Sequence, residues 1–81
     1  MKTKEIAAYV RNNVEDYEER LQLALNKMDH MREPLRMADW ELYDEIVSAI
    51  EEWCDDNEVC YDEVDWEEAI EGEEGIIWVD C

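Results

Sequence analysis

Most of the residues in this 81-residue sequence that could do chemistry are carboxylates, and they gather in its second half. Residues 39–81 contain 18 acidic side chains and no Lys, Arg or His. The first 38 residues hold seven acidic and seven basic side chains, so the whole formal charge of −18 belongs to the second half. Carboxylates in such number could transfer protons, bind a hard cation or attract a basic protein.

Proton transfer is the least favoured of these three uses. A catalytic carboxylic acid needs a raised pKa, which comes from burial or from a close charged neighbour. The amphipathic pattern described below places these carboxylates in water instead. His30, the one histidine, has no Ser or Cys near it in sequence that it could activate. We therefore predict a non-enzymatic protein with no catalytic residue and no cofactor.

A cation site is the second use, and the acidic stretch at residues 55–65 is its best candidate. An EF-hand loop that starts at Asp56 would place Glu67 at position 12. Cys60 and Tyr61 would then stand where the loop needs a ligand and a glycine. The sequence therefore predicts no dedicated metal site, and a divalent-cation binder remains a weaker alternative.

The cysteines and the apolar runs bear on the compartment. Cys54, Cys60 and Cys81 are an odd number without the spacing of a zinc site. No apolar run approaches the roughly 18 residues of a membrane span, and the first residues lack the apolar core of a signal peptide. We expect a cytoplasmic protein with reduced thiols and no membrane association.

The clearest element that would position the carboxylates is a helix over about residues 39–56, with Asp39 as its N-cap. One side is apolar and carries Trp40, Tyr43, Ile46, Val47, Ile50, Trp53 and Cys54. The opposite arc of about 140° carries Glu41, Asp44, Glu45, Glu51, Glu52, Asp55 and Asp56. Helix C-termini favour cations, but this one carries four acids, so the acidic face is costly to the helix and favours a functional role.

A second helix is predicted over residues 3–31, because apolar side chains recur there within an arc of about 120°. The stripe does not drift, which predicts one long straight helix. A break into two helices at Asn12 and Asn13 is the alternative, because Asn is a poor residue for a helix interior. Pro34 ends the helical stretch, because proline disfavours helix at the residue before it.

The last part of the chain predicts a short helix over residues 65–71, capped by Asp65 and stopped by Gly72. The following run Ile76-Ile77-Trp78-Val79 is β-prone. It could pair with residues 59–61, lie extended across the helices, or pair with a second chain to give a homodimer.

These elements predict one mainly α domain spanning residues 1–81. It would contain a long N-terminal helix, an antiparallel second helix and a short third helix. An extended C-terminal tail or a minimal two-stranded β ribbon would complete it.

The charge layout predicts the partner. A net charge of −18 opposes binding to nucleic acid or anionic lipid and attracts a basic protein surface. A nucleic-acid duplex presents one negative charge per roughly 1.7 Å of its axis, and an acidic helix face can imitate part of such a row. We therefore expect a partner that grips nucleic acid, such as a nuclease. The residues predicted to bind it are Glu41, Asp44, Glu45, Glu51, Glu52, Asp55 and Asp56 as the primary face, and Glu63, Glu67, Glu68, Glu71, Glu73 and Glu74 as its extension.

In size and charge layout the chain resembles the small acidic inhibitors of phages and mobile elements that mimic nucleic acid, of the anti-restriction and anti-CRISPR type. Those inhibitors share no common fold, so the resemblance implies a class of function and no residue roles. The alternative is a small adaptor, antitoxin or assembly protein that holds one basic protein partner. An exposed strand at residues 76–79 would favour that alternative.

Overall fold

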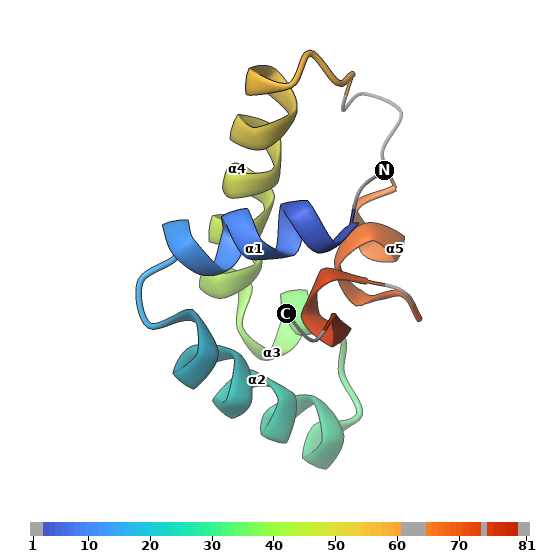
Figure 1. Ribbon diagram of the computed structural model, residues 1–81. Helices are drawn as coiled ribbons and strands as arrows, with labels where there is room; N and C mark the ends of the chain where they lie inside the picture. Colours follow the sequence, from blue (N-terminus) through green and yellow to red (C-terminus); the bar gives the residue numbers. More distant parts are fainter. Residues whose placement is uncertain (1–2, 61–64, 74, 80–81) are drawn as a thin grey trace.

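The structure is a computed structural model that describes residues 3–60, 65–73 and 75–79. These residues form α1 (Thr3–Asn13), α2 (Tyr17–Met31), α3 (Leu35–Ala38), α4 (Trp40–Asp56), α5 (Trp66–Glu71) and the 3₁₀ turn η1 (Ile76–Trp78). The described ranges contain no strand, which confirms the prediction of a mainly α fold. The chain fills a volume of 38 × 24 × 21 Å (Figure 1).

The long first helix is wrong, and the alternative with a break is confirmed. Helix α1 ends at Asn13, and α2 begins after a turn at Asp16, whose φ is 55°. The Asn13 amide nitrogen donates to the Tyr9 carbonyl at 2.7 Å, so this side chain competes for the backbone groups that a continuous helix would use. Aspartate tolerates the left-handed conformation better than most residues. Val14 and Tyr17, on either side of Asp16, are both buried in the core.

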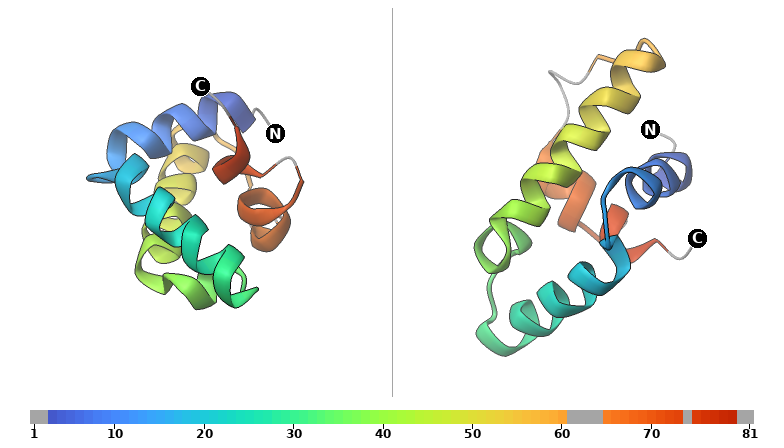
Figure 2. Two further views of the ribbon diagram at one scale, coloured as in Figure 1. Left: turned by 90° about the horizontal axis from the view of Figure 1, so that it is seen from below. Right: turned by 90° about the vertical axis from the view of Figure 1, so that its left-hand side faces the viewer.

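The sequence predicts that the helix over residues 39–56 packs antiparallel to the first helix. In the structure, α4 crosses α1 instead. Figure 1 shows α1 lying across the middle of α4, and the side view in Figure 2 looks nearly along α1 while α4 runs past it. Helices α1 and α3 make the most extensive contacts with α4. The fully buried side chains of this core come from elements along the whole chain and include Ile6, Val10, Leu35, Leu42, Ile46, Ile50, Cys54, Ile70 and Ile76.

The predicted helix caps are confirmed. The Asp39 carboxylate accepts from the Leu42 N–H at 3.1 Å, and Asp65 accepts from the Glu68 N–H at 3.3 Å. The Gly72 N–H donates to the carbonyls at the end of α5. A Cβ at Gly72 would lie 2.5 Å from the Glu68 carbonyl oxygen, so a larger residue would force the end of α5 apart.

The strand predicted at residues 76–79 is also wrong. Residues 76–78 form the 3₁₀ turn η1, which packs against α1 and α5. The turn directs two consecutive side chains, Ile76 and Ile77, into the core, and burial of their apolar surface stabilises the turn. Trp78 donates its indole N–H to the Glu71 carbonyl at 3.1 Å. The run therefore offers no strand edge for a homodimer, and Tyr61 of its expected pairing segment lies outside the described residues.

Replacing Ile50 with alanine should lower the free energy of unfolding by roughly 2–5 kcal/mol, because the fully buried side chain of α4 leaves a cavity between packed helices. Leu23→Ala is the matched control, because Leu23 is 62% exposed on α2, and it should change stability by less than about 0.5 kcal/mol. Urea denaturation followed by circular dichroism measures both. Equal losses in the two variants would show that the core is not where the structure places it.

Candidate functional site

The seven carboxylates predicted as the primary face lie along one surface of α4, opposite its buried side chains. Six of them are exposed, and Glu51 is half-buried. We call this set the acidic stripe: Glu41, Asp44, Glu45, Glu51, Glu52, Asp55 and Asp56. The regular alternation of apolar and acidic residues along α4 is therefore sufficient to place all seven on the surface.

The acidic stripe has the charge density of a nucleic-acid strand. Glu41 and Asp56 are fifteen residue steps apart, which is roughly 22 Å along a helix axis. Seven carboxylates over that length give one negative charge per roughly 3 Å, and one strand of a DNA duplex carries one per about 3.4 Å of axis. The match concerns charge per unit length along one helix surface.

One border of the acidic stripe is formed by α1 and α2. Arg20 of α2 forms an ion pair with Glu45. Tyr9 of α1 lies beside Glu52, and partial burial, the charges of Glu52 and Asp56 and a hydrogen bond with Glu52 raise the pKa of this phenol above its ordinary value. Glu45 is the one stripe residue that pairs with a basic side chain in residues 3–60, 65–73 and 75–79. Six of the seven stripe carboxylates thus have no ion pair with a basic residue of the described chain.

The C-terminal end of α4 carries charge that opposes its own helix dipole. Glu51, Glu52, Asp55 and Asp56 occupy the last turns, and no basic residue stands there. The thiol of Cys54 lies underneath, fully buried. Burial raises the pKa of this thiol, and the nearby charges of Asp55 and Glu51 raise it further. Helix stability therefore does not explain why these four acids are here.

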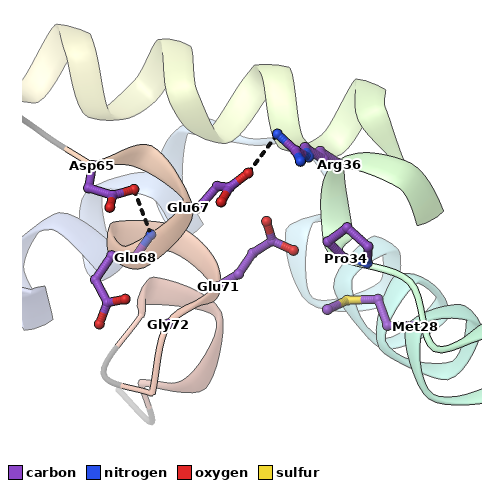
Figure 3. Close-up of a pocket in the computed structure, with 8 residues that line it drawn as sticks. All are labelled: Met28, Pro34, Arg36, Asp65, Glu67, Glu68, Glu71 and Gly72. Carbon is purple, nitrogen blue, oxygen red and sulfur yellow. Dashed lines mark hydrogen bonds and ion pairs between the residues drawn. The ribbon is translucent and has the colours of Figure 1, made fainter.

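The predicted extension on α5 is less available than the stripe. A hollow of about 480 Å³ lies between α5 and the α2–α3 connection. Figure 3 shows carboxylates on one wall of this hollow and Arg36 opposite. Glu67 pairs with Arg36 at 2.6 Å, and half-buried Glu71 accepts from the Leu35 N–H. These two carboxylates hold α5 against α3, so both already have partners within the chain.

The remaining residues of the extension divide into two groups. Glu68 and Glu73 are exposed and carry negative charge on the surface around α5. Glu63 and Glu74 lie outside the described residues. The structure thus brings together the seven carboxylates of α4 but gives the extension a mixed role.

Tyr43 joins α4 to this second acidic region. Its pKa is raised above the ordinary value, first by burial and then by the charges of Glu71 and Glu67, while Arg36 partly opposes the rise. The phenol is therefore held neutral beside two carboxylates. Its ionisation would add a third negative charge beside Glu67 and Glu71.

Trp40 departs from its predicted place. It was expected on the apolar side of the helix, but its side chain is 66% exposed at the first residue of α4. At about 100° per residue, Trp40 lies only about 20° from Glu51 and 40° from Asp44 around the helix axis, so it borders the acidic stripe. This angle follows from the sequence alone, but Trp40 was assigned to the apolar side because tryptophan is an apolar residue.

The ion pairs of Arg20 and Arg36 with acids of other helices were not predicted, because pairing across helices leaves no local pattern in the sequence.

Replacing Glu51 and Glu52 with Gln and Asp55 and Asp56 with Asn should raise the free energy of unfolding by roughly 1–2 kcal/mol at low salt. The reason is relief of unfavourable charge–dipole and like-charge contacts at the end of α4. The control replaces Glu18 and Glu19 with Gln in the first turn of α2, where negative charge is favourable, and should not stabilise the protein. Urea titration at low and high salt measures both, and destabilisation of the fourfold variant would contradict the interpretation.

Tyr43→Phe should reduce the loss of stability at alkaline pH. A raised pKa in the folded state means that the contribution of Tyr43 is complete below its ordinary value of about 10. That contribution is lost as the pH rises through the raised value. Urea denaturation on both sides of pH ~10 measures the effect, because tyrosine ionises there when unfolded. Identical alkaline losses in the two proteins would show that Tyr43 does not sense the carboxylates of α5.

Within the described ranges no three His, Cys, Asp or Glu side chains are grouped so that they could hold a metal ion. None of the helices in those ranges combines the length and the apolar character needed to cross a membrane. Comparisons with protein-family models, with curated proteins and with solved structures found no match.

Proposed function

We propose that this chain is a non-enzymatic binding protein that blocks a basic, nucleic-acid-binding protein surface by charge mimicry. The observation that carries the proposal is the acidic stripe. Seven carboxylates lie along one helix surface, and of these seven only Glu45 forms an ion pair with a basic residue of the described chain. Their arrangement costs the helix stability, which a role in binding would explain.

The spacing of the stripe supports a nucleic-acid-binding partner over any other basic surface. A protein that grips a strand places Arg and Lys at intervals that match the phosphates. A helix face with a similar charge per unit length attracts the same groups and competes for the same groove. The net charge of −18 opposes contact between the chain itself and nucleic acid.

The proposal places the chain with the anti-defence inhibitors of phages and mobile elements, acting in the cytoplasm on a nuclease or another nucleic-acid-handling enzyme. No cofactor or metal is needed for such a role, because the inhibitor only occupies a surface. The rival function, an adaptor, antitoxin or assembly protein, drew its support from an exposed strand at residues 76–79. Residues 76–78 form the turn η1 with two buried isoleucines, so that support is lost.

The fourfold variant at Glu51, Glu52, Asp55 and Asp56 tests the proposal. A tagged wild-type chain should retain a nucleic-acid-handling enzyme from a cell lysate at about 0.1 M salt, where charges about 10 Å apart still interact. The purified pair should then show an affinity that falls steeply with salt. The fourfold variant should bind more weakly and with a shallower dependence on salt, because four stripe charges are gone. Isothermal titration calorimetry at several salt concentrations measures both quantities.

The double variant at Glu18 and Glu19 is the control, because it removes exposed charge outside the stripe, and its affinity should stay near that of the wild type. Competition with free duplex or RNA separates the two functions. Displacement of the chain by nucleic acid supports mimicry. A partner that is held at high salt and is not displaced would support the adaptor instead.

A further inference from the structure

We infer that Trp40 is a stacking platform for an arginine side chain of the partner, placed at the N-terminal end of the acidic stripe. The inference rests on the proposed function and names the chemistry at one point of the contact. The partner surface presents arginine, rather than lysine, where it meets the start of α4.

The surroundings of Trp40 combine an aromatic face with unpaired acids. Trp40 lines a hollow of about 440 Å³ together with Arg20, Glu41, Asp44 and Glu45. Glu45 is occupied by Arg20, while exposed Glu41 and Asp44 have no ion pair with a basic residue of the described chain. An incoming cation therefore meets an indole ring and two carboxylates at once.

Trp40 is also held on a firm support. Asp39 caps α4 by accepting from the Leu42 N–H, which fixes the first turn from which the indole projects. Met37, three residues earlier in α3, is also largely exposed. An indole side chain has only two rotatable bonds, so it provides a large contact area at a low cost in conformational entropy, and tryptophan is common among residues that dominate interfaces.

Charge complementarity selects the occupant. A nucleobase could stack on the indole, but its phosphate would then approach Glu41 and Asp44 and be repelled. A guanidinium is planar, stacks on an aromatic face and donates to carboxylates at the same time. An ammonium group is a strongly hydrated point charge and stacks less well. The Arg20–Glu45 ion pair in the same hollow shows that a guanidinium and a carboxylate already pair there within the chain.

The test uses two probes: a short peptide of alternating Arg and Ala, and its Lys counterpart of equal length and charge. Binding of both peptides to the wild-type chain and to Trp40→Leu is measured by calorimetry. Leucine keeps an apolar side chain and removes the aromatic face. The preference for the Arg peptide over the Lys peptide should fall roughly two- to fivefold in Trp40→Leu, the size of an exposed cation–π contact.

Met31→Leu is the control, because Met31 is similarly exposed at the far end of α2, and it should leave the preference unchanged. Circular dichroism checks the fold of each variant. A second variant, Glu41→Gln with Asp44→Asn, keeps Trp40 and should also reduce the preference by removing the acceptors.

The outcomes separate the inference from the function on which it rests. If the Arg preference falls in Trp40→Leu and in the acid variant, the stacking site is supported. If the preference is the same in Trp40→Leu and the wild type, the inference is overturned while acidic binding stands. If the wild-type chain binds neither peptide at low salt, the proposed function fails together with the inference.

Discussion

Burial of the apolar face of α4 is the interaction on which the rest of the structure depends. That face is too wide for one partner helix, so α1 crosses it and α3 packs against its beginning. The buried side chains Leu42, Ile46 and Ile50 join a single cluster with residues from both ends of the chain. Once this face is covered, the acidic face has only water or another protein to meet. The fold thus presents charge as a direct result of burying apolar surface.

The two halves of the chain carry different charges and interact through ion pairs. The first half is formally neutral, and it sends Arg20 and Arg36 to acids of the second half, Glu45 and Glu67. Exposed ion pairs of this kind contribute only about 0–1 kcal/mol each, so they guide the packing of helices more than they offset the charge. A net charge of −18 remains as self-repulsion in the folded state. A basic partner would relieve that repulsion.

Much of the candidate site could be predicted from the sequence, because α4 is long, strongly periodic and capped by Asp39. The break after Asn13 could not be decided from periodicity, since a bent chain can keep the same apolar residues on the core side. The turn η1 was missed for a different reason. Its β-branched residues are typical of a strand. In the structure, however, Ile76 and Ile77 are buried in the helical core, and propensity alone could not predict this packing. Trp40 was assigned to the wrong side because it lies at the border between the apolar and acidic faces of α4, where periodicity alone does not decide whether a side chain is buried.

The packing of η1 against α1 has a consequence for how the molecule folds. Ile6 and Ile76 belong to the same buried cluster although 70 positions separate them in the chain. Closing so long a loop costs conformational entropy before any contact compensates for it. A topology of this kind slows folding compared with a bundle of sequential neighbours. Because small single domains usually unfold in one step, and α1 and η1 share one buried cluster, the core beneath the acidic face should be lost as a whole.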